Sequence, residues 1–166
     1  MKDTSTMWRI LRADYRNPAH AQALIILLDE YASGPSGGGE PLPENVKAEL
    51  IPTLQRTNHA LSLLAFVGDE PIGLLNAFET LSTFKAKPLI NIHDIAVTEN
   101  WRRKGVGRAL ILELENIARQ RGCAKLTLEV LEKNLGAQVL YRELGFEGYQ
   151  LQEEFGRALF WQKALR

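Results

Sequence analysis

The sequence predicts an α/β (α+β) fold, in which a mixed, mostly antiparallel sheet of about seven strands carries helices on both faces. Three apolar runs, at 60–67, 72–81 and 89–97, are separated by short turns, which is typical of an antiparallel meander. A helical pattern after Gly105 then lies between two strand patterns, which indicates a parallel pair of strands. Further helical patterns before and after these strands supply the covering layers.

One strand and two helices are expected ahead of the meander. Residues 8–13 alternate as a strand does, and the Asn-Pro pair at 17–18 begins a helix with periodic apolar positions. The glycine-rich loop at 33–39 ends that helix. A second helix follows Pro43, and Pro52 inside its apolar pattern predicts a kink or a break at the preceding residue.

The C-terminal part is predicted as a strand, a helix and a closing hairpin. Residues 125–130 alternate as a strand. Apolar positions at helical spacing follow Asn134, and Gly145 ends that helix. The runs at 146–151 and 158–164 predict the last two strands of the sheet.

Length and composition favour one globular domain spanning residues 1–166. The chain is 45% hydrophobic and 24% charged with a formal net charge of 0, so nothing suggests a nucleic-acid partner. Its apolar runs are too short to cross a membrane, and the N-terminus lacks the pattern of a signal peptide. Cys123 is the only cysteine, which excludes an intrachain disulfide. We therefore expect a cytoplasmic protein with no membrane partner and no metal site.

The stretch from His93 to Ala109 predicts an anion-binding site. It joins an apolar strand to a helix through the consecutive cations Arg102, Arg103 and Lys104 and a Gly-x-Gly. The glycines let the backbone approach a ligand closely, and the start of a helix offers unpaired N–H groups and a favourable dipole. A phosphate or a pyrophosphate fits these properties. An ordinary strand-to-helix turn with a solvated basic face is the alternative interpretation.

Two other phosphate-binding loops are excluded by their spacing. The P-loop requires Gly-x-x-x-x-Gly-Lys-Ser/Thr, and the chain has no such run. The dinucleotide fingerprint requires a third glycine where this chain has Leu110. What remains, Arg102-x-x-Gly105-x-Gly107, resembles the coenzyme A pyrophosphate loop (Arg/Gln-x-x-Gly-x-Gly/Ala) of the GNAT superfamily of N-acetyltransferases.

A second motif supports the same resemblance. The run Asn134-x-x-Ala137-x-x-x-Tyr141-x-x-x-Gly145-Phe146 is similar to the C-terminal signature of that superfamily, and the predicted order of elements is the one its fold requires. The resemblance covers at least residues 60–150. It implies a GNAT fold splayed between its fourth and fifth strands, with acetyl-CoA as the cofactor. It also implies transfer of the acetyl group to a primary amine by direct attack in a ternary complex.

The resemblance also implies which residues contact the cofactor. In the family, the end of the fourth strand bonds the pantetheine arm through its backbone, which corresponds here to Ile95, Ala96 and Val97. Asn134 would contact the pantetheine or adenosine part, or act as a helix N-cap, or do both. The loop that would surround the pyrophosphate comprises Arg102, Arg103, Lys104, Gly105, Val106, Gly107, Arg108 and Ala109.

Two side chains are candidates for catalysis. In the family pattern the Val97 N–H group stabilises the oxyanion, and the Tyr141 phenol protonates the departing thiolate. The alternative for Tyr141 is a core-filling aromatic residue with a satisfied hydroxyl group. His93 lies on the strand beside the expected thioester and is the candidate base, with a chain of water molecules as the alternative.

The acceptor is the least constrained part of the prediction. The pair His93-Asp94 resembles the Glu-Asp pair of polyamine acetyltransferases, with His in place of Glu, so a small cationic amine is favoured. Asp94 points away from His93 on a regular strand, but a bulge near Ile95 would re-aim either residue. Glu79 is a second candidate for binding a cationic acceptor, with a solvated surface carboxylate as the alternative.

Other functional classes remain open at this stage. A protein N-terminal or lysine acetyltransferase would act on a peptide instead, and a sensor module would bind acyl-CoA without chemistry. The apolar run Leu159-Phe160-Trp161 would permit a homodimer, but it would serve equally as core.

Overall fold

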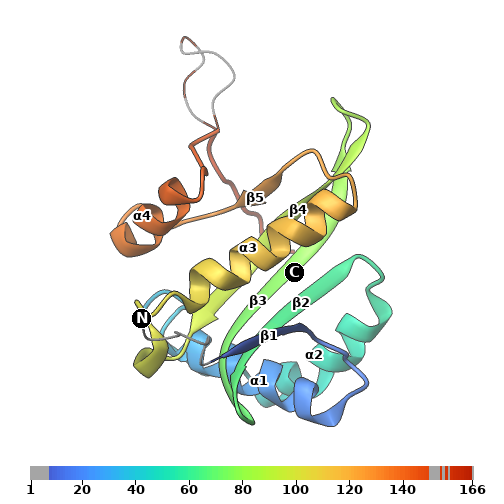
Figure 1. Cartoon of the computed structure of the whole chain (residues 1–166), viewed down its shortest axis with the longest axis vertical. Coiled ribbons are helices and arrows are strands. Elements are labelled where there is room, and N and C mark those ends of the chain that lie inside the picture. The colour runs from blue at the N-terminus through green and yellow to red at the C-terminus, as the bar shows by residue number, and fades with distance from the viewer. Residues whose placement is uncertain (1–7, 150–153, 155, 157, 166) are drawn as a thin grey trace, which may run out of the picture. The chain divides into compact units, whose positions relative to one another are not determined.

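The computed structural model of the chain describes residues 8–149, 154, 156 and 158–165. The chain divides into two compact units, Met1–Leu131 and Glu132–Arg166 (Figure 1). The first unit contains the sheet with its covering helices, and the second contains α4 (Leu135–Glu143). The single domain expected over residues 1–166 stays a prediction.

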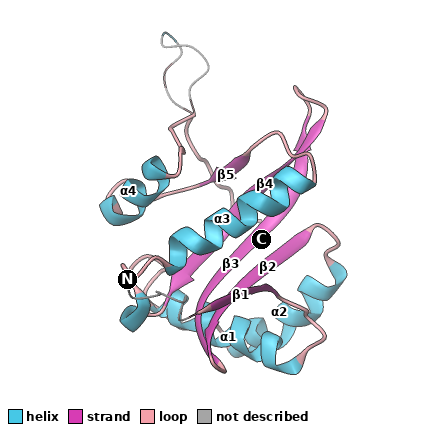
Figure 2. Ribbon diagram, in the orientation of Figure 1, coloured by secondary structure: helices cyan, strands magenta, loops and turns pink. Residues whose placement is uncertain are grey.

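The first unit is built on a five-stranded sheet with the order β1-β2-β3-β4-β5 (Figure 2). The first four strands are antiparallel to their neighbours, and β5 pairs in parallel with β4. The predicted fold class and the predicted parallel pair are therefore confirmed. The bounds of the strands are β1 (Arg9–Arg12), β2 (Ala60–Val67), β3 (Glu70–Ser82), β4 (Lys87–Val97) and β5 (Leu126–Leu128).

The sheet has five strands rather than the predicted seven or so. The described residues of the expected closing hairpin, 146–149 and 158–164, form no strand. The Ala158 N–H donates a backbone hydrogen bond to the Tyr149 carbonyl over 3.2 Å. A two-stranded hairpin is marginal without a further strand or a packed face, and the side chains of Leu159 to Trp161 are exposed. The rest of this predicted hairpin (150–153, 155 and 157) lies outside the described residues.

Two helices cover one face of the sheet. Helix α1 (Pro18–Ser33) begins at Asn17, whose side chain accepts hydrogen bonds from the N–H groups of Ala19 and His20. Helix α2 (Glu44–Arg56) runs without interruption through Pro52, so the predicted break is wrong. The core on this face comprises Ala13, Ala23, Leu24, Leu27, Ile51, Leu54, Ala60, Leu64, Phe66 and Leu74. Burial of Ile51 and Leu54 in that core stabilises α2 enough to offset the hydrogen bond that proline removes, a cost of about 3 kcal/mol.

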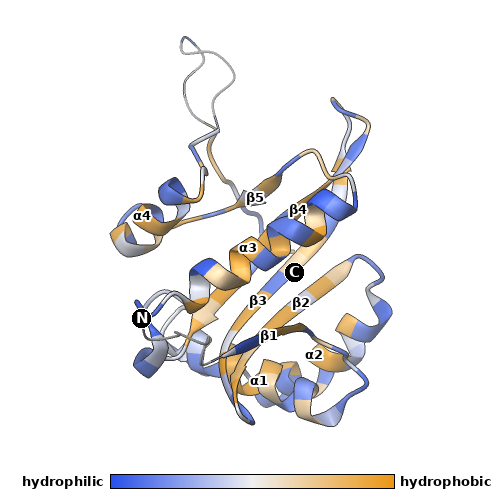
Figure 3. Ribbon diagram, viewed as in Figure 1, coloured by the Kyte–Doolittle hydropathy of each residue, from blue (hydrophilic) through white to orange (hydrophobic). Residues whose placement is uncertain are grey.

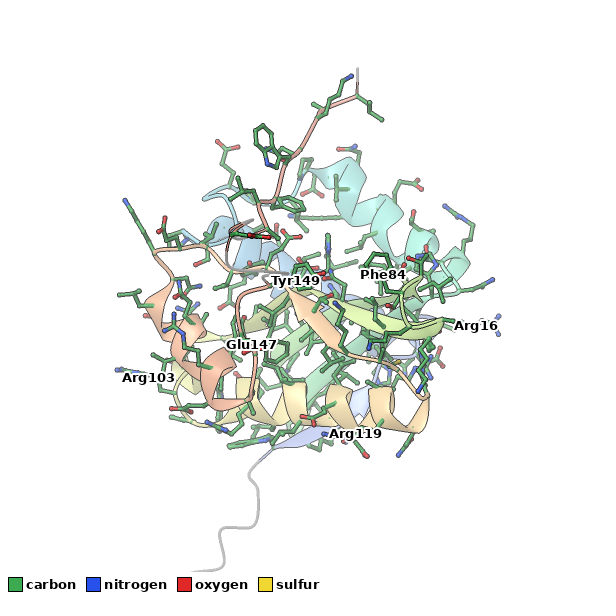
Figure 4. The ribbon with its side chains drawn as sticks, turned by 90° about the horizontal axis from the view of Figure 1, so that it is seen from above. Arg16, Phe84, Arg103, Arg119, Glu147 and Tyr149 are labelled. Atoms are coloured by element: carbon green, nitrogen blue, oxygen red, sulfur yellow. The ribbon has the colours of Figure 1, made fainter. Side chains whose placement is uncertain are left out.

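Helix α3 (Val106–Gln120) covers the opposite face (Figure 4). Its residues Leu110, Ile111 and Leu114 are fully buried. Apolar residues, orange in Figure 3, run along β2 and recur in α1 and α3, which pack against the sheet. The described helices include none that is long and apolar enough to cross a membrane.

Gly73 on β3 allows α3 to lie close to the sheet. A Cβ at this position would lie 3.2 Å from the Ala96 carbonyl oxygen, 3.2 Å from Val106 Cγ1 and 3.3 Å from Leu110 Cδ1. Val106 is the first residue of α3, so this contact fixes where the helix begins relative to β3 and β4.

Replacement of Gly73 by valine is expected to destabilise the protein by about 1–3 kcal/mol, because overpacking must push α3 away from the sheet. Chemical denaturation followed by circular dichroism measures the change. Gly136→Ala in α4 is the control, since no atom lies within 4 Å of its added Cβ, and its stability should be equal or slightly higher. Equal stability of Gly73→Val and the wild type would contradict the close packing described here.

Candidate functional site

A β-bulge in β4 places His93 and Asp94 on the same face of the sheet. Asn76 pairs with Asp94 and Ala77 pairs with Ile92, so His93 is an extra residue on β4. A bulge near Ile95 is one way in which either residue could be re-aimed, and the structure has such a bulge two residues earlier, at His93. The His93 ring meets the Phe78 ring edge-on at 5.5 Å between centroids, and Phe78 packs against the core beneath α1.

Asp94 faces the same side as His93. The Asn76 Nδ2 donates a hydrogen bond to Asp94 Oδ2 over 3.1 Å. From α1, Tyr31 approaches the same carboxylate: burial raises the pKa of the Tyr31 phenol, and the charge of Asp94 raises it further. Asp94 is half-buried, and it forms no ion pair with any residue that the structure describes. A carboxylate and an imidazole thus lie together on the α1 side of β4.

Beyond the bulge, β4 has an open edge. Its ladder with β5 ends at the pair Ile92 and Leu128, although β4 continues to Val97. The Thr98 N–H donates to the Ile72 carbonyl over 2.9 Å. Because antiparallel pairs alternate, Ile95 and Val97 direct their N–H and C=O groups away from β3. Ala96, by the same alternation, directs its backbone groups towards β3, so two of the three predicted backbone contacts lie on the open edge.

The basic loop after β4 ends in a helix start without a capping side chain. A 3₁₀ helix (η1, Glu99–Trp101) leads into it, and Arg103 (φ 57°) and Gly105 (φ 91°) both adopt left-handed backbone conformations. Gly105 is the N-cap of α3 and, as a glycine, supplies no side-chain hydrogen bond to the first N–H groups of that helix. Figure 4 shows the Arg103 side chain extending outward from this loop. An uncapped helix start preceded by cations is a suitable environment for an anion.

Two tryptophans support the loop, and sequence reasoning did not single them out. Trp8 meets Trp101 edge-on at 6.2 Å between ring centroids, and Lys104 Nζ lies 4.9 Å from the centroid of the Trp101 ring. A Cβ at Gly105 would come within 3.8 Å of Trp8. The preceding Thr98 has a buried hydroxyl oxygen with no hydrogen-bond partner among the described residues. The aromatic pair therefore holds the loop in place while a polar atom beside it stays unsatisfied.

Arg102 links the loop to the open edge. Its Nε donates a hydrogen bond to the Val97 carbonyl oxygen over 3.0 Å. The loop and the last residue of β4 are thereby fixed to each other, and both belong to the stretch that the sequence predicts as an anion site.

The second unit arranges the other motif around α4. Asn134 is the N-cap of this helix, because its Oδ1 accepts a hydrogen bond from the Ala137 N–H over 3.3 Å. Tyr141 is buried, and its ring lies 5.9 Å from that of Phe146. Gly145 ends the helix with a positive φ of 86°, which lets the Phe146 N–H bond the Tyr141 carbonyl over 2.9 Å. The N-cap interpretation of Asn134 is thus confirmed, and the motif residues are locally well defined.

Glu79 does not join His93 and Asp94. It follows Phe78 on β3 and so faces the α3 side, where Arg121 donates to its carboxylate over 2.9 Å. This ion pair neutralises Glu79 within the protein. Glu79 and Asp94 lie on opposite faces of the sheet. Among the described residues, no group of three or more His, Cys, Asp or Glu side chains is placed to hold a metal ion.

Comparison with known proteins adds independent information. The family model described as "Acetyltransferase (GNAT) family" matches residues 24–146. A thialysine N-epsilon-acetyltransferase of Caenorhabditis elegans is 28% identical over 130 residues, which cover 75% of each chain. The aminoglycoside N(6')-acetyltransferase type 1 of Serratia marcescens is 28% identical over 136 residues, 79% of this chain and 85% of that one.

A solved structure shares the fold. It is that of AAC(6')-Iy in complex with the bisubstrate analogue CoA-S-monomethyl-acetylneamine, with a TM-score of 0.74 and 19% identity. The match covers 95% of this chain and 99% of the other.

Proposed function

Since the chain belongs to the GNAT family of acetyltransferases, we propose that it transfers the acetyl group of acetyl-CoA to a small-molecule cationic amine. Family membership makes it an acyltransferase enzyme with acetyl-CoA as its cofactor. The observation that carries the choice of acceptor is Asp94, a half-buried carboxylate beside His93 without a cationic partner among the described residues. A positively charged acceptor would supply that partner.

The basic loop fits the pyrophosphate of this cofactor. Arg103 and Gly105 turn the backbone around the start of α3, and the N-cap Gly105 supplies no side chain to the first N–H groups. The cofactor-binding residues that we propose here are Arg102, Arg103, Lys104, Gly105, Val106, Gly107, Arg108 and Ala109. Asn134 would add a contact through its side-chain amide, whose oxygen already caps α4.

The open edge of β4 fits the pantetheine arm. Ile95 and Val97 present backbone groups that β5 does not reach, so an extended ligand can bond them as a neighbouring strand would. Ala96 lies between them and contributes its side chain to the packing beneath α1 rather than a backbone contact. This arrangement would bring the thioester end of the cofactor to the last residues of β4.

Bound acetyl-CoA supplies an acetyl thioester that an amine can attack. An alkylamine with a pKa near ~10.4 must first lose a proton, and His93, directly or through water, is the group that we expect to accept it. The Val97 N–H, which points to the open edge, would stabilise negative charge on the carbonyl oxygen. Tyr141 would donate the proton that the departing sulfur requires.

The relatives support a small amine as the acceptor. The thialysine and aminoglycoside acetyltransferases that this chain resembles are both named for small amine substrates. We place Asp94 in the acceptor site and leave Glu79 out of it, because Arg121 already neutralises Glu79 on the other face of the sheet.

The proposal is tested by measuring thiol release from acetyl-CoA with polyamines, aminoglycosides, lysine analogues and peptides as acceptors. We expect turnover with small cationic amines at least tenfold faster than with peptides, because a buried charge pair contributes strongly to discrimination. Turnover confined to peptides would favour an N-terminal or lysine acetyltransferase. Tight binding of acetyl-CoA without turnover of any amine would contradict the enzyme and favour a sensor.

Replacement of Tyr141 by phenylalanine is expected to lower kcat by about 10²-fold or more, because a general acid contributes a factor of this order. The affinity for acetyl-CoA should change little, since the ring still packs against Phe146. Steady-state kinetics and calorimetric titration measure the two effects. Tyr149→Phe, at an exposed tyrosine of the same unit, is the control. An unchanged kcat in Tyr141→Phe would assign Tyr141 to the core instead.

Replacement of His93 by alanine is expected to remove the acidic limb of the pH–rate profile. A general base acts only when it is unprotonated, so activity falls as the pH decreases and the base becomes protonated. His59→Ala is the matched control, because His59 packs on the same Phe78 ring at 5.9 Å. Retention of the limb in His93→Ala would identify a water relay as the base.

A further inference from the structure

A chain of hydrogen bonds crosses the sheet and ends at Asp94. The Tyr15 hydroxyl lies 2.9 Å from Ser62 Oγ, and Ser62 Oγ lies 2.6 Å from Asn76 Oδ1. Asn76 Nδ2 then lies 3.1 Å from Asp94 Oδ2. Ser62 and Asn76 are only 1% and 5% exposed, and among the residues that the structure describes they are the two buried polar ones. Burying polar side chains costs free energy of folding unless they are hydrogen-bonded. A functional role for this chain of hydrogen bonds would explain why it is buried.

The hydrogen bonds from Tyr15 to Asp94 all donate in the same direction. Asn76 Oδ1 carries no proton, so Ser62 must donate to it, and Tyr15 must therefore donate to Ser62. Burial raises the pKa of the Tyr15 phenol, which keeps the donating proton in place. The reverse orientation of the Asn76 amide would set its oxygen against the Asp94 carboxylate, which is repulsive. Every donor therefore points towards Asp94.

Asp94 is held on one side and open on the other. Asn76 donates to Oδ2, while Oδ1 accepts no hydrogen bond from the residues that the structure describes. Along an extended strand Asp94 lies three residues before Val97, which corresponds to about 10 Å. An ammonium group bound by Asp94 would therefore be a different group from the amine that would react beside the Val97 N–H.

We propose that Tyr15, Ser62 and Asn76 are positioning residues that fix the Asp94 carboxylate to bind a second, non-reacting ammonium group of the acceptor. This inference rests on the proposed function and deepens it, because it assigns selectivity for diamines over monoamines to a named set of buried side chains. The bulge at His93 turns Asp94 towards this chain of hydrogen bonds. An ammonium group that bonds an oriented carboxylate is well stabilised.

The test compares 1,5-diaminopentane with pentylamine, which lacks the second charge. We expect Asn76→Ala and Tyr15→Phe to lower the ratio of kcat/KM for the diamine to that for the monoamine, by about tenfold and about threefold respectively. The KM for acetyl-CoA should stay within about twofold of the wild type, since none of these residues belongs to the proposed cofactor site. Asp94→Asn should lower the same ratio at least as far as Asn76→Ala.

A matched control lies on the same strand. Asn91 Oδ1 accepts a hydrogen bond from Thr127 Oγ1 over 2.9 Å, so Asn91→Ala removes a polar pair of β4 that is not connected to Asp94. Its ratio of diamine to monoamine activity should equal that of the wild type.

The outcomes separate this inference from the function on which it rests. An equal loss of activity with both amines in either folded variant, or an unchanged ratio, would show that the chain is structural and would overturn the inference. If Asn76→Ala does not fold, Tyr15→Phe, which removes one oxygen atom, decides alone. A wild type that acetylates other small cationic amines but neither of these two would also overturn the inference, whereas a wild type that acetylates no amine would contradict the proposed function.

Discussion

The register shift at His93 is the constraint on which the described site depends. Without the extra residue in β4, His93 and Asp94 would alternate across the sheet, and only one of them would face α1. The same shift reverses which backbone groups of the following residues point towards β3. It therefore directs the backbone groups of Ile95 and Val97 to the outer edge, where Arg102 bonds the Val97 carbonyl. One inserted residue thus places His93 and Asp94 on one face of β4 and also directs the backbone groups of the following residues to its open edge.

The position of the basic loop before α3 depends on close packing by neighbouring residues rather than on the loop's own residues. Gly73 brings α3 against the sheet, and Val106 at the start of that helix touches the space where a Cβ would lie. The loop that precedes α3 therefore has a fixed end, and the pair of Trp8 and Trp101 fixes its underside. Left-handed conformations at Arg103 and Gly105 are tolerated because these neighbours hold both ends of the turn.

Much of this architecture follows from local patterns in the sequence. The meander, the parallel strand after α3 and the caps at Asn17 and Asn134 all follow from periodicity and from capping chemistry, which act over a few residues. The position of the bulge and the buried pair of Ser62 and Asn76 do not, because each depends on pairing between strands far apart in the sequence. The continuity of α2 through Pro52 is similar: burial of Ile51 and Leu54 outweighs the local preference.

The hydrogen bond from Arg102 to the Val97 carbonyl has a consequence for solubility. An exposed strand edge with unpaired groups can recruit a strand from another molecule, and proteins commonly protect such edges with charged side chains. Arg102 places a guanidinium group directly on the last acceptor of the open edge. This charge disfavours edge-to-edge association at the end of β4 even when no ligand lies along the edge. If β5 continued along β4 to this point, the edge would be paired and no ligand could bond it.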